Sequence, residues 1–142
     1  IGDAALAIFP IGGTSKLLDE ACTPSEGACK RALAAARDAR ERIDALNQRR
    51  QVAGDPPIRF GLALHVGDVM YGNIGVPERL EFTVIGKAAN EAARLEAMCK
   101  ELGHPILISS AFPRCFPDEM ISLGTHALRG VSEAQEIFTL AD

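Results

Sequence analysis

The chain has 142 residues, of which 47% are hydrophobic and 24% are charged, and its formal net charge is −4. This length suits one domain or part of one, and the apolar fraction is large enough for a buried core. The acidic balance argues against a protein that binds duplex nucleic acid, because such proteins normally carry a basic surface. No apolar run approaches membrane-spanning length and no signal peptide is visible, so we expect a cytoplasmic location without membrane contact.

The cysteines do not suggest a metal site. They show no Cys-x-x-Cys spacing, and no histidine lies at ligand spacing from them, so we do not expect structural zinc. Reduced thiols in a cytosolic protein are the simpler account. The four residues are Cys22, Cys29, Cys99 and Cys115.

The first predicted element is a short strand. Residues 4–9 are an apolar run of the length of a buried strand, and Gly2 and Asp3 would form the turn that leads into it. An aspartate at such a place is often plain turn chemistry. Residues 10–26 are rich in glycine, proline and small polar side chains, which predicts a loop.

A long helix is predicted next, over residues 28–46. Ser25 is a candidate cap, and apolar or alanine positions recur at helical spacing between Leu33 and Ile43. Acidic and basic residues interleave on the remaining surface, which favours a solvated face over a nucleic-acid patch. Residues 47–57 end in a Gly-Asp-Pro-Pro run and are predicted to be a loop.

The centre of the chain begins with a strand and continues into a glycine-rich segment. Residues 60–66 are apolar at every second position and on both sides in the middle, which predicts a strand buried on both faces or nearly so. We expect His65 in this strand to be a core histidine with satisfied hydrogen bonds. Gly67, Gly72 and Gly75 predict a bulge or tight turn, because glycine adopts positive φ angles at little cost.

A second strand and a helix follow. A loop over 76–79 leads into a strand over 80–85, which Gly86 breaks. The pattern then predicts a helix over 87–102. Gly103 ends this helix in the usual way for a glycine after the last turn.

On that helix Asn90 and Arg94 stand four residues apart, so they share one face. Their neighbours are mostly alanines, which leave room for a ligand or a partner chain. An ordinary solvated helix face has the same pattern, so spacing alone does not decide between these interpretations.

The C-terminal part is predicted to consist mainly of strands. Strands and helices therefore alternate along the chain, as α/β or α+β layering requires. The predicted elements are strands over 106–109, 120–123 and 134–140, and one helical turn within 110–116.

Several ordered blocks resemble the catalytic domain of class III nucleotidyl cyclases, most strongly that of bacterial adenylate cyclases. Such a series is a more specific signal than any single glycine motif. The blocks are Gly72-Asn-Ile-Gly75, Glu78-Arg79, Phe82-Thr-Val-Ile-Gly86, Asn90 and Arg94-Leu-Glu96, with further likeness from Ile1 to Phe9 and from Leu128 to Phe138.

Because the resemblance covers nearly the whole chain, residues 1–142 are interpreted as a partial class III adenylate/guanylate cyclase catalytic domain. It implies an α+β fold (an α/β sandwich), namely a ferredoxin-like cyclase domain with a central, mostly antiparallel sheet and flanking helices. The family's first strand, the helices after it, its first metal-binding aspartate and its adenine-contacting lysine normally precede the position of Ile1. We therefore expect an N-terminally truncated domain that is inactive alone.

The resemblance also implies a reaction. The ribose 3′-hydroxyl of ATP attacks its own α-phosphorus and expels pyrophosphate, which makes the enzyme a phosphorus-oxygen lyase that produces cyclic AMP for signal transduction. It implies two Mg²⁺ or Mn²⁺ ions per site, which prefer oxygen ligands, and Asp3 matches one of the metal-binding aspartates. Asn90 matches the asparagine that holds the ribose, and Arg94 the arginine that stabilises the transition-state phosphate.

Three further residues are assigned to the substrate on the same resemblance. Thr83 occupies the position that reads the purine, and threonine there favours ATP over GTP. Arg79 and Arg129 are candidates for the triphosphate, and each is equally compatible with a surface position. The family's sites form between two chains, so the resemblance implies a homodimer with its sites at the interface.

Two other interpretations remain open. One is a cyclase-homology module that keeps the fold, lacks catalysis and acts as a dimerising regulatory partner. Retention of Asp3, Asn90 and Arg94 argues against it, because a dead copy has no physical need for all three. The other is a guanylate cyclase, which Thr83 disfavours.

Overall fold

The computed structural model divides into two compact units, Ile1–Arg59 and Phe60–Asp142. For residues 24, 25, 71, 74 and 81–83 it describes the backbone alone. The residues described are 4–11, 24–74, 77–78, 81–112, 119–128 and 133–141.

The first unit is dominated by helix α1 (Pro24–Ala53), whose ends complement the helix dipole with Glu26 in the first turn and Arg50 in the last. The predicted helix over 28–46 is confirmed but too short. The loop predicted from residue 47 is wrong up to residue 53, because this stretch is rich in glutamine and arginine, which are good helix formers. The helix stops only at Gly54, which adopts a φ of 79°.

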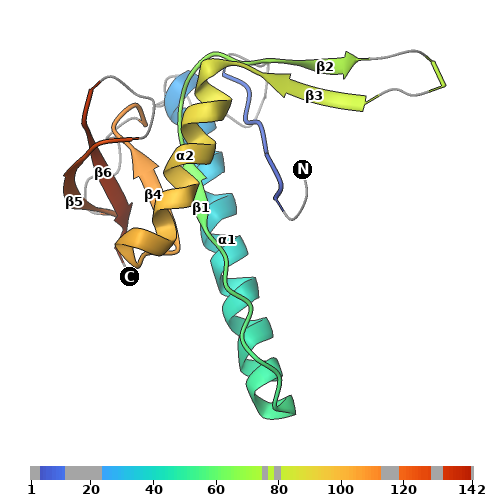
Figure 1. The fold of residues 1–142 in the computed structure, drawn as a ribbon, viewed down its shortest axis with the longest axis vertical. Coiled ribbons are helices and arrows are strands. Elements are labelled where there is room, and N and C mark those ends of the chain that lie inside the picture. Colours follow the sequence, from blue (N-terminus) through green and yellow to red (C-terminus); the bar gives the residue numbers. More distant parts are fainter. Residues whose placement is uncertain are drawn as a thin grey trace. The chain divides into compact units, whose positions relative to one another are not determined.

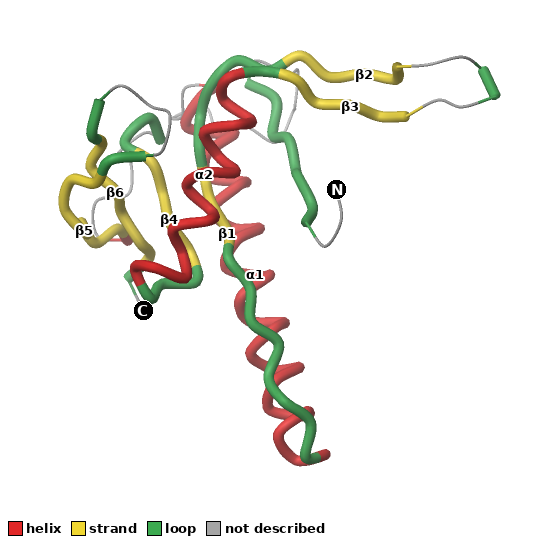
Figure 2. The backbone as a smooth tube through the Cα atoms, viewed as in Figure 1, coloured by secondary structure: helices red, strands yellow, loops and turns green. Residues whose placement is uncertain are grey.

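After α1 the chain runs back along the last turns of the helix (Figure 2). The Asn47 side chain holds it there: its amide nitrogen donates to the Ile58 carbonyl at 2.9 Å, and its oxygen accepts from the Ile58 N–H at 2.7 Å. Arg50 Nε donates to the Pro56 carbonyl at 2.8 Å. These side chains satisfy backbone groups in a segment that has no strand partner among the described residues.

Residues 4–10 form no regular secondary structure and are mostly exposed, so the predicted buried strand over 4–9 is wrong. A strand needs a neighbour that supplies ladder hydrogen bonds, and no described strand pairs with this segment. A side chain makes a contact instead: Arg31 donates to the Pro10 carbonyl at 3.2 Å. The turn predicted at Asp3 lies outside the described residues.

The second unit contains a four-stranded sheet with strand order β1-β4-β6-β5 (Figure 1). β1 is parallel to β4, while β4 pairs with β6, and β6 with β5, in antiparallel fashion. Helix α2 packs on β1 and β4 and lies between them in the chain. The elements are β1 (Leu62–Leu64), α2 (Lys87–Leu102), β4 (Ile106–Ser109), β5 (Met120–His126) and β6 (Gln135–Leu140).

The sheet is mixed but mostly antiparallel, and with its helix it confirms the predicted α+β class. The strands predicted over 106–109 and 134–140 are confirmed, the second to within one residue. The strand predicted over 120–123 continues to His126, past a register shift between Ser122 and Thr125. The helical turn predicted within 110–116 falls largely outside the described residues.

The core of this unit lies between α2 and the sheet. Every residue of β4 is buried, as a central strand covered on both faces requires. By contrast β1 is shorter than predicted, and only Leu64 is fully buried, because β1 lies at an edge of the described sheet. The main apolar cluster comprises Leu95, Cys99, Leu107, Leu128 and Ile137.

A separate antiparallel hairpin joins β2 (Met70–Ile74) to β3 (Glu81–Ile85) and extends beyond the sheet (Figure 1). The predicted strand over 80–85 is thereby confirmed. The predicted bulge or tight turn at the glycines is wrong at Gly72, which lies within β2 opposite Thr83. Gly72 does not adopt a positive φ. It pairs like any other strand residue, because the hydrogen bonds between strands join backbone groups only.

No helix in the part of the chain that the structure describes combines the length and the apolar character needed to cross a bilayer.

Candidate functional site

Helix α2 begins at a close backbone approach. Its N-cap, Gly86, has a φ of 151° and makes no side-chain capping bond, and the first turn contains no acidic residue. A Cβ on Gly86 would lie 3.0 Å from the Asp68 carbonyl oxygen, and one on Gly67 would collide with Ala88. Glycines at these two positions therefore let the segment between β1 and β2 pass directly under the first turn of α2.

Replacing Gly86 with alanine is expected to lower the free energy of unfolding by about 1–3 kcal/mol, the cost of holding a non-glycine residue in such a backbone conformation. The contact with Asp68 adds to this strain. Urea unfolding followed by circular dichroism measures it. Gly72→Ala is the matched control, since a Cβ there meets nothing within 4 Å and φ is not positive. Equal stabilities of the two variants would contradict the prediction.

Asn90 and Arg94 lie on the exposed face of α2, opposite the buried Leu95 and Cys99. The predicted helix over 87–102 is confirmed at both bounds, so the shared face follows from helical geometry. Within the described residues neither side chain makes a hydrogen bond or an ion pair. Both polar groups are therefore free to contact a molecule outside the fold of this unit.

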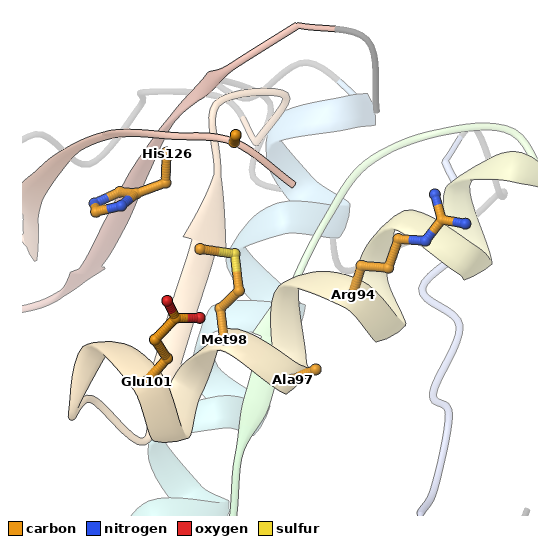
Figure 3. A pocket seen from close by; sticks show the side chains of 6 residues that line it. Arg94, Ala97, Met98, Glu101 and His126 are labelled. Carbon is orange, nitrogen blue, oxygen red and sulfur yellow. The ribbon is translucent and has the colours of Figure 1, made fainter. Parts of the chain in front are cut away.

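A surface pocket of about 410 Å³ opens beside Arg94. Figure 3 shows Met98 between Arg94 and His126, with the Arg94 guanidinium directed away from the Glu101 carboxylate. The guanidinium is thus not neutralised within its own pocket. The lining residues are Arg94, Ala97, Met98, Glu101, His126 and Ala127.

The side chains of the other predicted site residues lie outside the described part of the chain. Thr83 lies in β3 and pairs with Gly72 through its backbone, but its side chain is outside the described part. Asp3, Arg79 and Arg129 also lie outside the described residues. The structure therefore brings together only Asn90 and Arg94 of the predicted set.

A buried polar cluster lies under the same helix. His65 Nδ1 is 2.6 Å from Ser109 Oγ, and His65 Nε2 is 2.8 Å from Glu91 Oε2. The His65 and Glu91 side chains are 7% and 14% exposed, and Lys87 Nζ, at the surface, is 3.5 Å from the other Glu91 oxygen. His65 is thus a core histidine with satisfied hydrogen bonds, as predicted.

Sequence reasoning missed Glu91 and Ser109. A signal was present, because Glu91 falls on the buried stripe of α2, four residues before Leu95. Burying an unpaired carboxylate on the apolar side of a helix costs free energy. A glutamate at such a position therefore indicates a buried partner.

Cys99 lies one turn after Leu95 on the buried face of α2. Burial raises the pKa of the Cys99 thiol above its ordinary value, and the nearby Glu96 carboxylate raises it further, while a hydrogen bond to Leu62 opposes the rise. The neutral thiol donates to the Leu62 carbonyl at 3.6 Å. Cys99 is therefore a packing residue and not a reactive thiolate.

The described residues do not contain the metal ligands that the resemblance implies. No group of three or more histidine, cysteine, aspartate or glutamate side chains converges among them to hold an ion. Asp3, the predicted ligand, lies outside that part.

Comparison with known proteins identifies the family. Over 116 residues the chain is 35% identical to adenylate cyclase 1 of Rhizobium meliloti (strain 1021), a match that covers 80% of this chain and 17% of that protein. The adenylyl cyclase CyaB from P. aeruginosa has the same fold, with a TM-score of 0.66 and 24% identity over 87% of this chain and 64% of that chain. This chain belongs to the class III nucleotidyl cyclases.

The cyclase fold is shared by enzymes with different substrates. The guanylyl cyclase Cya2 matches with a TM-score of 0.64 and 25% identity over 87% of this chain and 62% of that chain. The structural matches therefore do not choose between an adenine and a guanine nucleotide. No model of a known protein family matches the chain. This cyclase domain spans only 17% of the length of the Rhizobium relative.

Proposed function

We propose that this chain is a partial catalytic domain of an adenylate cyclase, which converts ATP to 3′,5′-cyclic AMP and pyrophosphate. One observation carries the proposal: Asn90 and Arg94 occupy one exposed helix face without a partner among the described residues, and Arg94 lines a surface pocket. In a cyclase chain these are the side chains that match the family's ribose and phosphate contacts. The 35% identity to a protein named adenylate cyclase supports the choice of reaction.

The chemistry places specific demands on these two side chains. The 3′-oxygen forms a bond to the α-phosphorus, the bond from that phosphorus to the pyrophosphate oxygen breaks, and the hydroxyl proton passes to solvent water. Negative charge gathers on the phosphoryl oxygens as the leaving group departs. Arg94 suits this charge because its guanidinium is always protonated and offers planar donors that are already in place.

Asn90 would act on the ribose, which carries the attacking 3′-oxygen. Its amide can both donate to and accept from ribose oxygens, so it can hold the sugar with its 3′-oxygen facing the phosphorus. Orientation of this kind contributes much of the barrier reduction in intramolecular reactions. Because Asn90 and Arg94 are one turn apart on a rigid helix, one element would position both ends of the attack.

The remaining parts of the proposal rest on the resemblance. Thr83 would read the adenine, Arg79 and Arg129 would bind the triphosphate, and Asp3 would be a ligand to Mg²⁺ or Mn²⁺. The two ions would offset phosphate charge. The sites would form at the interface of a cytoplasmic homodimer, and residues 1–142 alone would be inactive. Robust turnover of ATP with Mn²⁺ by this segment alone would refute that last point.

Replacing Asn90 with alanine in the complete protein is expected to lower kcat for cyclic AMP formation by about 10–100-fold, because the ribose is no longer held in the attacking geometry. Product chromatography of reactions with ATP and Mn²⁺ measures the rate. Lys100→Ala, an exposed substitution near the other end of α2, is the control and should retain wild-type activity. A rate for Asn90→Ala equal to that of the control would count against the assigned role.

The likeness to a guanylyl cyclase structure keeps GTP as a second candidate substrate. Direct competition between ATP and GTP separates the two. Preferential formation of cyclic AMP supports the proposal, whereas preferential formation of cyclic GMP replaces it with a guanylate cyclase.

A further inference from the structure

The buried cluster of His65, Ser109 and Glu91 ties three elements together. β1 pairs with β4 in parallel register, with Leu64 opposite Ile108. His65 directly follows Leu64 and Ser109 directly follows Ile108, so these two polar side chains meet at the carboxyl ends of neighbouring strands. Glu91 reaches His65 from the second turn of α2, and His65 in turn contacts Ser109. The cluster is therefore a polar link between the sheet and the helix that carries Asn90 and Arg94.

When the His65 imidazole is neutral, the hydrogen bonds of the cluster run from Ser109 through His65 to Glu91. A carboxylate can only accept, so His65 Nε2 carries a hydrogen and donates to Glu91. In the neutral imidazole Nδ1 is then an acceptor, and the Ser109 hydroxyl donates to it. Each group is thus satisfied by the next, and no buried side-chain nitrogen or oxygen among the described residues lacks a partner. Such a satisfied network holds its members in one geometry.

The N-terminal half of α2 has few other anchors. The first turn lacks a side-chain cap, and the residues that face inward there are alanines, which bury little apolar area. The large buried side chains, Leu95 among them, come later in the helix. Glu91 is adjacent to Asn90 and three residues before Arg94. Its position therefore sets how this part of α2 is rotated about the helix axis, and so where the side chains of Asn90 and Arg94 point.

We propose that Glu91, held by His65 and Ser109, is a positioning residue that fixes the orientation of Asn90 and Arg94 toward the substrate. The inference rests on the proposed cyclase function and deepens it. The cluster lies on the buried side of α2 and the pair on the exposed side. Glu91 therefore acts through the helix and does not touch the nucleotide.

The test compares Glu91→Ala with Glu91→Gln in the complete protein. Alanine removes the acceptor for His65, and we expect kcat to fall by about 10–100-fold, as small misplacements of reacting groups do, with KM changed by less than about threefold. Glutamine keeps a carbonyl oxygen at the same reach, so its kcat should stay within about threefold of wild type. Ser109→Ala, which removes only the far end of the cluster, is a milder second variant should Glu91→Ala fail to fold.

Thr139→Val is the matched control for simple loss of a buried hydrogen bond. Thr139 Oγ1 donates to the Ile106 carbonyl at 2.7 Å, and this bond joins two strands of the sheet without involving α2. It should lower stability without a selective loss of kcat. A kcat loss in Glu91→Ala no larger than in Thr139→Val, or a loss that glutamine does not restore, would overturn the inference.

Amide hydrogen exchange supplies a readout that does not depend on activity. In Glu91→Ala, exchange over residues 87–94 is expected to accelerate more than over β4 and β6, and Thr139→Val should not reproduce this pattern. If the wild-type protein produces no cyclic nucleotide, the proposed function fails, whereas the exchange data still decide whether the cluster holds the start of α2. Unchanged exchange over residues 87–94 in Glu91→Ala would overturn the positioning role.

Discussion

Replacing Arg94 with alanine in the complete protein is expected to reduce kcat for cyclic AMP formation by about 10²–10³-fold, the usual cost of removing one donor that faces developing negative charge. The side chain is exposed on α2 and has no intramolecular partner within the described residues, so its loss should leave the fold intact. Steady-state rates with ATP and Mn²⁺, together with a thermal melt, measure the two effects separately.

Arg94→Lys and Lys100→Ala sharpen this experiment. Lysine keeps the positive charge but not the planar set of donors, so Arg94→Lys should recover only part of the lost rate. Lys100 lies on the same helix away from the pocket, so its alanine variant should behave as wild type. Undiminished output from Arg94→Ala would favour a cyclase-homology module in which this arginine has no catalytic task.

Replacing Leu107 with alanine is expected to lower the free energy of unfolding by about 2–5 kcal/mol, because it leaves a cavity in a fully packed site. Leu107 has no exposed surface and belongs to the cluster that joins β4 to α2. Chemical denaturation of the wild type and the variant measures the difference.

Ile121→Ala is the control for Leu107→Ala. Ile121 lies in the same sheet but is 50% exposed, so its truncation should change stability by less than about 0.5 kcal/mol, as for most surface substitutions. Equal losses in the two variants would show that β4 is not the packed centre of this unit.

Local sequence signals predicted the elements that carry the candidate site. Gly86 and Gly103 bracket α2, and both adopt positive φ angles, so the helix bounds could be predicted from glycine chemistry alone. The shared face of Asn90 and Arg94 then follows from the helical period. By contrast, the end of α1 was misplaced, because residues 47–53 contain no helix breaker and polarity alone does not end a helix.

The features that sequence reasoning missed depend on pairing between distant segments. His65 is 26 residues from Glu91 and 44 from Ser109, so no local pattern could join them. The short β1 and the irregular conformation of residues 4–10 likewise depend on which strands are neighbours. The roles of Asp3, Arg79, Thr83 and Arg129 stay predictions, since their side chains lie outside the described part of the chain.

Within the described residues, the four-stranded sheet ends at β1 on one side and at β5 on the other, and these two edge strands bear on aggregation. A free strand edge is a template on which a foreign strand can add, and proteins blunt such edges by keeping them short or by distorting them. β1 offers only three residues, and β5 is interrupted between Ser122 and Thr125, where Gly124 has a φ of 85°. An intruding chain would find few consecutive backbone groups in register at either margin, which favours solubility over fibrous assembly.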